Sequence, residues 1–212
     1  MKIVAFSDSH GYLPDIEPCD LLIIGGDFCP IIDHSLSYQQ RWLATIFGPW
    51  LERVPARHII GIAGNHDVIF NHGHECGYPV PMLPWTYLQD RQVEYEGLLI
   101  YGTPYQKQFN NWPFMRTEWE LDRLWYDMPY SDILISHGPP KGVLDYYKGE
   151  NLGSSVLRQK IVELSIPLTI CGHIHENNGV EQIGKLSYVY NVAVCDNKSD
   201  LTYIPTVISL GD

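Results

Sequence analysis

The most constraining feature of this chain is a set of short apolar runs, each followed by polar, carboxylate or imidazole residues. Runs of this length that are rich in β-branched residues are typical of buried strands. The five motifs that follow the runs are Asp8-Ser9-His10, Gly26-Asp27, Gly64-Asn65-His66-Asp67, Ser136-His137-Gly138 and Gly172-His173-Ile174-His175. Because ligands bind beyond the carboxyl ends of strands in open α/β sheets, we expect these motifs to meet at one edge. Together they predict a site for two adjacent metal ions.

The spacing of the motifs assigns roles to four of these residues. Asp8 and His10 lie two positions apart, so their side chains would share a face of a strand end and hold the first metal. Asp27 has two carboxylate oxygens, which can bridge ions about 3.5 to 4 Å apart. Asn65 offers an amide oxygen to the second metal. Carboxylate and imidazole ligands without thiolate suit manganese, the ion we expect first, and also iron, zinc or cobalt.

Five longer stretches extend these motifs and carry a family resemblance: GGDFCP, IAGNHD, IYGTPYQKQFNNWPF, SHGPPKGVLD and GHIHE. They resemble the calcineurin-like metallophosphoesterase superfamily and, within it, the vertebrate metallophosphoesterase-domain-containing proteins and their bacterial and phage relatives. The resemblance covers nearly the whole chain. It implies an α/β fold, a two-layer mixed β-sandwich flanked by helices, with a binuclear metal centre and hydrolysis of phosphodiesters or phosphomonoesters.

The resemblance also implies roles for the remaining histidines of the motifs. His137 and His173 would complete the second metal, and His175 the first. His66 would be a proton donor to the leaving oxygen rather than a ligand, and Asp67 would hold its imidazole in position. Hydroxide bridging the metals would attack phosphorus in line, without a covalent intermediate.

Substrate contacts are less constrained by the sequence. His34 follows Asp27 in a loop and is either a peripheral substrate contact or a solvent-exposed residue. His72 and His74 imitate a metal pair, but they lie in a Gly- and Pro-rich stretch, which indicates a loop that could line the pocket. Three aromatic residues could stack a nucleobase or belong to the core, and both alternatives stay open: Tyr105, Phe109 and Trp112.

Composition limits the class of protein. The 212 residues suit a single domain over residues 1–212. A net charge of -11 argues against binding of long nucleic acids, which requires clustered cations, but not against a small anionic substrate. Five scattered cysteines without a C-x-x-C pair argue against a disulfide framework or zinc finger and favour the cytoplasm. No apolar run approaches the ~20 residues of a membrane helix, and we expect neither export nor membrane binding. The sequence does not predict an oligomeric state.

The periodicity of apolar residues predicts a mixed α/β order. Helices are expected at about 38–52, 117–127 and 154–165, because apolar residues recur there at spacings of three and four. Strands are expected up to residue 8 and at 20–27, 58–64, 132–136, 168–172, about 186–194 and 203–210, with hairpin-like strands at about 92–103.

The sequence differs from the motifs of better-known branches of the superfamily, and these differences reduce the number of candidate reactions. The D-R-G of serine/threonine protein phosphatases is missing after Asp27, Pro30 stands where purple acid phosphatases carry a metal-binding tyrosine, and Asp8 replaces the cysteine of lariat-debranching enzymes. A small phosphodiesterase acting on cyclic nucleotides or related diesters remains. The alternatives are a phosphomonoesterase or nuclease of the same superfamily, or a non-catalytic nucleotide-binding regulator.

Overall fold

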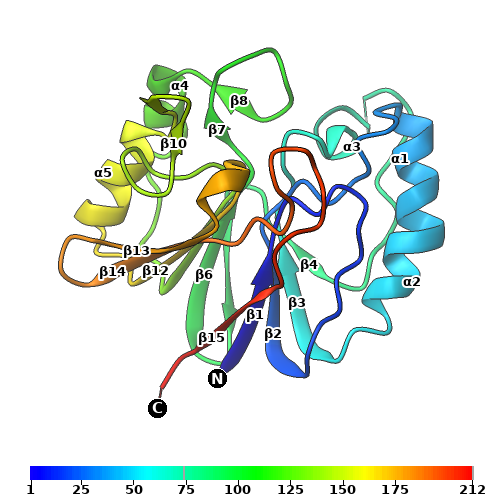
Figure 1. Cartoon of the computed structure of the whole chain (residues 1–212), viewed down its shortest axis with the longest axis horizontal. Coiled ribbons are helices and arrows are strands. Elements are labelled where there is room, and N and C mark those ends of the chain that lie inside the picture. Colours follow the sequence, from blue (N-terminus) through cyan, green and yellow to red (C-terminus); the bar gives the residue numbers. More distant parts are fainter. Residues whose placement is uncertain (74, 212) are drawn as a thin grey trace.

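Two mixed β-sheets stack face to face in the computed structural model, which describes residues 1–73 and 75–211 (Figure 1). The first sheet has the strand order β15-β1-β2-β3-β4, with β1, β2, β3 and β4 parallel and β15 antiparallel to β1. Its strands are β1 (Lys2–Phe6), β2 (Cys19–Ile24), β3 (Ala56–Gly61), β4 (Thr86–Tyr87) and β15 (Thr206–Ser209).

The second sheet has the order β13-β14-β12-β9-β6-β5, in which β6, β9, β12 and β14 are parallel and the two edge strands are antiparallel. Its strands are β5 (Arg91–Tyr95), β6 (Leu98–Thr103), β9 (Ile133–Ser136), β12 (Leu168–Cys171), β13 (Gly179–Ile183) and β14 (Ser187–Asn191). The antiparallel strand β13 was not predicted, because its exposed face leaves only a weak apolar pattern in GVEQI.

The core between the sheets explains why the strands read as continuous apolar runs. In β1, Ile3 and Ala5 face the second sheet, whereas Val4 and Phe6 belong to the cluster on the outer side. All four side chains are buried, because both faces of the sheet are covered. The alternation of side chains between the two faces of the strand therefore leaves no alternation of apolar and polar residues in the sequence.

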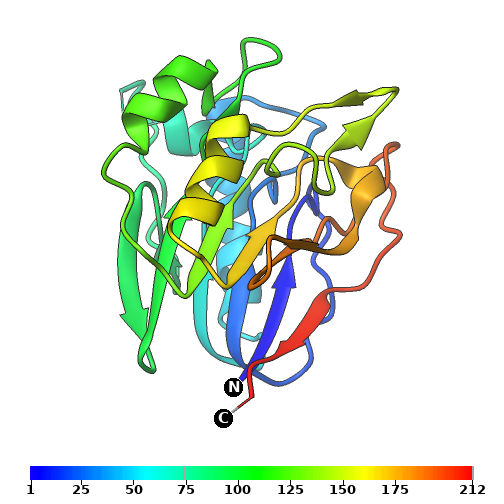
Figure 2. The same ribbon diagram turned by 90° about the vertical axis from the view of Figure 1, so that its left-hand side faces the viewer.

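Helices cover both outer faces, which confirms the predicted sandwich flanked by helices (Figures 1 and 2). The first sheet is covered by α1 (Leu36–Trp42), a π-helical segment (Leu43–Phe47) and α2 (Gly48–Leu51). The second is covered by α4 (Glu118–Leu124) and α5 (Ser155–Glu163), whose buried Leu121, Leu157 and Ile161 form the third apolar cluster. None of the helices in the described ranges is both long and apolar enough to cross a bilayer.

The helix predicted at about 38–52 is interrupted by the π-helical segment. Pro49 has no amide hydrogen, and the preceding amide of Gly48 bonds to the Leu43 carbonyl five residues back. A proline inside a helix removes one hydrogen bond and crowds the preceding turn, so the helix rewinds locally.

Short elements that were not predicted lie close to the ends of the parallel strands. They are α3 (Val68–His72), the strand pairs β7 (Gln106–Lys107) with β8 (Met115–Arg116) and β10 (Tyr146–Tyr147) with β11 (Glu150–Asn151), and the 3₁₀ helix η2 (His175–Asn177). Both termini lie at the opposite end of the sandwich (Figure 1). The edge at the ends of the parallel strands is therefore formed by loops and short elements, which can build a site.

Candidate metal centre

The five motifs come together at one edge of the sandwich. Asp8 follows β1, Asp27 follows β2 and Asn65 follows β3, while His137 and His173 follow β9 and β12 of the other sheet. Backbone hydrogen bonds tie the loops together. The amide of Asp8 donates to Gly26 O at 2.9 Å, the amide of His10 to Asp27 O at 3.0 Å and the amide of Gly172 to His137 O at 2.9 Å.

The first group of possible ligands consists of Asp8, His10 and His175, with one ligand atom of each within 4.8 Å of the others. His175 Nε2 lies 3.2 Å from Asp8 Oδ1 and 3.2 Å from His10 Nε2. The His175 Nδ1 atom donates to the Asp196 carbonyl at 2.8 Å, which directs Nε2 towards the carboxylate. The amide of His173 donates to Asp8 Oδ2 at 2.9 Å, so Asp8 presents Oδ1 to the group.

The second group repeats this arrangement with Asp27, His137 and His173. His137 Nε2 lies 3.3 Å from Asp27 Oδ2, and His137 Nδ1 donates to the Gly25 carbonyl at 2.9 Å. The other carboxylate oxygen of Asp27 accepts the amide of His66 at 2.7 Å. In each group, one carboxylate oxygen thus lies next to one imidazole nitrogen. The backbone binds the other oxygen of the carboxylate and the other nitrogen of the imidazole.

The groups have the chemistry of a metal centre. Among the described residues, His10 Nδ1 and His137 Nε2 are buried without a hydrogen-bond partner, which is costly unless a ligand is bound. Two glycines make room for the donors: a methyl group on Gly64 would collide with Asp27 and His137, and one on Gly172 would collide with Asp8. The residues present therefore fit divalent ions.

Protonation follows the same pattern in both groups. Burial opposes a proton on His137, but the charge and hydrogen bond of Asp27, the charge of Asp8 and the Gly25 carbonyl together raise the pKa of His137 to about 10. Burial also opposes a proton on His175, but the hydrogen bond and charge of Asp8, the Asp196 carbonyl and the charge of Asp27 together raise its pKa to about 9. Burial lowers the pKa of His10 to about 4 and that of His173 to about 3. Because metals bind deprotonated ligands, an ion would displace the protons from the first two rings.

Four of the candidate ligands have left-handed backbone conformations. The φ angles are 55° at Asp8, 46° at His10, 54° at Asp27 and 67° at His173. This conformation is uncommon outside glycine and costs about 1 kcal/mol or more per residue, so it is retained where surrounding structure enforces it. Because these residues are not extended, the alternation of side chains that was predicted for Asp8 and His10 at a strand end does not apply to them.

Asn65 is buried between Gly64 and His66, both of which contact Asp27. Its Oδ1 atom accepts a hydrogen bond from Gln106 Nε2 at 2.6 Å. One lone pair of that oxygen is left for a metal, and Gln106 fixes the orientation of the amide. No role was predicted for Gln106, because a buried glutamine in a strand of two residues offers no distinctive signal.

The predicted contact between Asp67 and the His66 ring is wrong. The Asp67 carboxylate accepts three backbone amides at 2.8 Å each, those of Asp27, Cys29 and Gly64. Asp67 points inward from the start of α3, where it ties the β2 and β3 loops together, so it is turned away from the imidazole of its neighbour. Burial and then the charge of Asp27 raise the pKa of Asp67 to about 7.

His34 takes the place that was expected for Asp67. His34 Nε2 and His66 Nδ1 are joined by a hydrogen bond of 2.8 Å. The His66 ring stands edge-on to His10, with ring centroids 5.1 Å apart, and lies 4.8 Å from the centroid of Trp112. His66 therefore projects over the first group, held from behind by a second histidine and an indole.

The remaining substrate candidates separate in the structure. Phe109 is exposed and its ring lies 5.3 Å from His173. Tyr105 packs edge-on against Phe114 at 5.5 Å, beside the third apolar cluster, with the Arg116 guanidinium 4.8 Å above its ring. His72 is exposed at the end of α3, and its only side-chain hydrogen bonds in the described residues are with Asn71. His74 lies outside the described residues.

Residues 1–177 match the family model of the calcineurin-like phosphoesterases. The chain belongs to this family. Human metallophosphoesterase domain-containing protein 1 is 32% identical over 238 aligned positions, which cover 99% of this chain and 71% of the human protein. UPF0046 protein K07C11.7 of Caenorhabditis elegans is 29% identical, over 98% of this chain and 74% of the worm protein.

Solved structures agree on the fold. One of 16% identity matches with a TM-score of 0.62 over 90% of this chain and 89% of its own. Protein TT1561 of Thermus thermophilus, 15% identical, has a TM-score of 0.53 over 90% of this chain and 88% of its own. Calcineurin-like phosphoesterases use divalent metal ions, and the chain is accordingly a metal-dependent phosphoesterase.

Proposed function

We propose that this calcineurin-like phosphoesterase is a phosphodiesterase that uses two divalent ions to hydrolyse cyclic nucleotides or other small diesters. The observation that carries the proposal is the repeated group of one carboxylate and two imidazoles at a single edge of the sandwich. Each group contains a carboxylate beside a histidine, Asp8 beside His175 and Asp27 beside His137. The second ring nitrogen of each of these histidines is held by a backbone carbonyl. We assign Asp27 to the bridge and Asn65 to the second ion.

The ions would supply polarisation of the phosphoryl oxygens and a nucleophile formed from water at neutral pH. Manganese is the ion to supply first, although the donor set equally suits iron, zinc or cobalt. The chain contributes the rigid placement of the donors, because loop backbone rather than solvent orients them.

His66 is the proposed proton donor to the leaving oxygen. Its Nδ1 atom is hydrogen-bonded to His34, which leaves Nε2 as the ring nitrogen that can deliver a proton. Trp112 packs on the ring and restricts its rotation. The position of the His66 ring beside His10 supports a role over the metal centre rather than in the core.

The charge of one cavity beside the site favours a diester over a monoester. A cavity of about 250 Å³ adjoins both groups of ligands through His173 and His175, and it is lined by Glu176. None of the described residues that line it is lysine or arginine. A phosphomonoester dianion gains most from charge-assisted hydrogen bonds with such cations, whereas a diester carries one negative charge. The cavity therefore suits the monoanion better.

Small substrates are favoured over polymers. The net charge of -11 opposes binding of long nucleic acids, which is driven by neutralisation of phosphates. All five cysteines are free, which is compatible with the cytoplasmic location that we propose.

A substrate panel tests the proposal. Purified protein, stripped with chelator and reloaded with Mn²⁺, is assayed on bis(p-nitrophenyl) phosphate, p-nitrophenyl phosphate and 2′,3′- and 3′,5′-cyclic nucleotides. We expect diester turnover to exceed monoester turnover by at least about tenfold, and the chelated protein to be inactive. A faster monoester reaction would assign the chain to the phosphomonoesterases. No turnover of any substrate would support a non-catalytic binding protein.

Glu176 provides a matched pair of variants. Glu176→Lys adds a cation to the cavity wall and should raise the monoester-to-diester ratio of kcat/KM, whereas Glu176→Gln only removes the charge and should raise it less. Equal ratios in both variants would mean that the charge of this wall does not select the substrate.

A further inference from the structure

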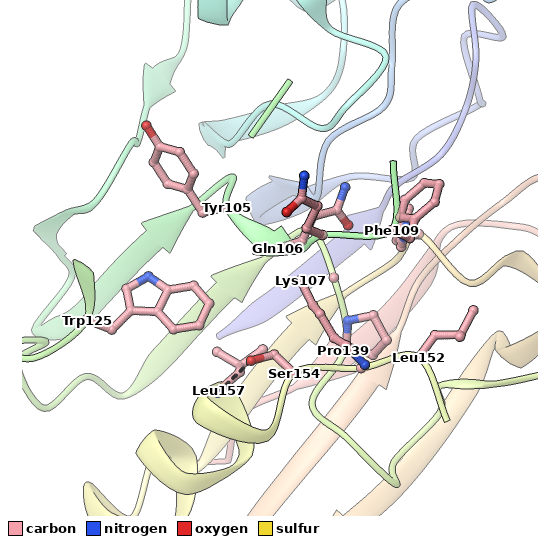
Figure 3. Close-up of a pocket in the computed structure, with 13 residues that line it drawn as sticks. Tyr105, Gln106, Lys107, Phe109, Trp125, Pro139, Leu152, Ser154 and Leu157 are labelled. Carbon is pink, nitrogen blue, oxygen red and sulfur yellow. Dashed lines mark hydrogen bonds between the residues drawn. The ribbon is translucent and has the colours of Figure 1, made fainter. Parts of the chain in front are cut away.

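Beside the second group of ligands lies an enclosed slot of about 120 Å³, which we call the Gln106 slot (Figure 3). Its walls include Gln106, Phe109, Trp125, Pro139, Leu157 and His173. His173 also belongs to the second group of candidate ligands, so the slot opens directly onto the centre. It is well below the roughly 300 Å³ at which pockets begin to hold drug-sized ligands, and it suits a single small ring system.

Gln106 is a wall residue of this slot and carries an unpaired polar atom. Its side chain is 3% exposed, and its Nε2 atom donates to Asn65 Oδ1. The Oε1 atom is buried and has no hydrogen-bond partner among the described residues. Gly138 is another wall residue, and a Cβ atom added to it would lie 3.1 Å from that oxygen, so the glycine leaves space beside Oε1. Exchanging O and N of both amides would still leave one Gln106 atom unpaired, but the Asn65 oxygen would then be lost to the metal.

Lys107 and Gln108 also line the slot, whereas the hydroxyl of Ser154 and the indole of Trp125 already have partners. The Ser154 hydroxyl donates to Glu118 at 3.0 Å and accepts the amide of Leu157 at 3.1 Å. The Trp125 indole donates to Thr103 Oγ1 at 3.3 Å. Gln106 Oε1 is therefore a buried acceptor without a partner among the described residues, in a slot that has aromatic and apolar walls and the polar side chains of Lys107 and Gln108.

We propose that the Gln106 slot binds the nucleobase of the substrate and that Gln106 Oε1 accepts a hydrogen bond from its exocyclic amino group. This inference rests on the proposed phosphodiesterase function and makes Gln106 a specificity-determining residue. A base offers flat apolar faces to Phe109 and Pro139 and an N–H donor at its edge. A sugar carries several hydroxyl groups around its ring and lacks flat apolar faces, so Phe109, Pro139 and Leu157 would leave part of those hydroxyl groups without partners.

A pair of substrates that differ by one amino group tests the proposal. The p-nitrophenyl esters of adenosine 5′-phosphate and of purine riboside 5′-phosphate share the phosphodiester and the leaving group. Wild-type protein should prefer the adenosine ester in kcat/KM by about fivefold to a hundredfold, because the analogue leaves Oε1 buried and unpaired. Binding of the two nucleoside monophosphates, measured by calorimetry, should show the same preference.

Variants separate the two contacts of Gln106. Gln106→Met should reduce the preference for the amino group to about one, whereas Gln106→Glu keeps an acceptor oxygen and should retain it. Any effect through Asn65 changes both esters alike and cancels in the ratio. Gln159→Met is the matched control and should keep the wild-type ratio, because Gln159 is an exposed residue of α5 whose side chain bonds Glu163.

The outcomes distinguish this inference from the function on which it rests. A wild-type ratio of one, or a preference that survives in Gln106→Met, would overturn the role of Gln106 while hydrolysis of both esters upholds the phosphodiesterase. Failure to hydrolyse either ester would overturn the phosphodiesterase, and the calorimetric comparison would still decide whether the slot reads the amino group.

Discussion

The site is built from two kinds of region that differ in how firmly they are held. The ligand cradle, composed of Asp8, His10, Asp27, His137, His173 and His175, follows directly from strand ends, and its carboxylates and His137 are almost completely buried. The rim, composed of His34, His66, Phe109 and Trp112, comes from loops and is partly or largely exposed.

This difference suggests that the cradle carries the catalytic chemistry and that the rim controls substrate selectivity. Each carboxylate of the cradle has one oxygen bound by a backbone amide, so its geometry is set before any substrate arrives. Three rim side chains, His34, His66 and Trp112, contact one another through rings 4.8 to 5.3 Å apart, and Phe109 contacts His173 of the cradle. We therefore expect changes in the cradle to affect every substrate alike, and changes in the rim to depend on the substrate.

The largest expected effect is in the cradle. Asp27→Asn or His175→Ala should lower kcat/KM on all diesters by at least about a thousandfold, because several kcal/mol of transition-state stabilisation depend on the ions. Steady-state kinetics with metal analysis measures both losses. Retention of activity after exhaustive chelation would refute a metal-dependent cradle.

His66→Asn tests the boundary between the two regions. It should reduce hydrolysis of cyclic nucleotides by about 10² to 10⁴, since an alkoxide needs a proton to leave, and should spare much of the activity on bis(p-nitrophenyl) phosphate. Metal content should stay unchanged. If both activities and one metal disappear together, His66 belongs to the cradle as a ligand.

Asp67→Ala should act on the fold rather than on the leaving group. It removes the acceptor of three buried backbone amides and should lower the free energy of unfolding by about 3 kcal/mol or more. Denaturant titration measures the change. A variant of normal stability that selectively lost activity on cyclic nucleotides would restore the predicted role of Asp67 in orienting His66.

His34→Ala should weaken alkoxide departure by about tenfold, the lower range for loss of a residue that orients a functional imidazole. The nitrophenyl diester should be nearly unaffected. His72→Ala is the control, because His72 is an exposed histidine on the nearby helix. Equal rates for His34→Ala and wild type on cyclic nucleotides would mean that Trp112 alone holds His66.

The smallest expected effect distinguishes two aromatic residues of one segment. Phe109→Ala should raise KM for nucleotides by about fivefold, through a lost stacking surface of about 1 kcal/mol in the Gln106 slot. Tyr105→Ala should lower thermal stability with similar losses on all substrates, because Tyr105 packs beside the apolar cluster of the second sheet. The reverse pattern would exchange their roles.

The sequence by itself determined the fold class and the family, because the buried parallel strands leave apolar runs and the residues after them are neighbours in the chain. The motifs contain the candidate ligands for the same reason, and the family resemblance implied how His137, His173 and His175 divide between the two ions. The cradle is local in sequence at each strand end, and the pairing of the sheets brings the ends together.

Only the tertiary structure decided what surrounds those groups. Asp67 and His66 are adjacent in sequence, yet one points into the β2 and β3 loops and the other over the site. His34 reaches His66 across 32 positions and Gln106 reaches Asn65 across 41. Such contacts depend on how loops cross at the sheet edge and on left-handed turns at Asp8, Asp27 and His173. No periodicity records them, because each is a single long-range contact between side chains of ordinary type.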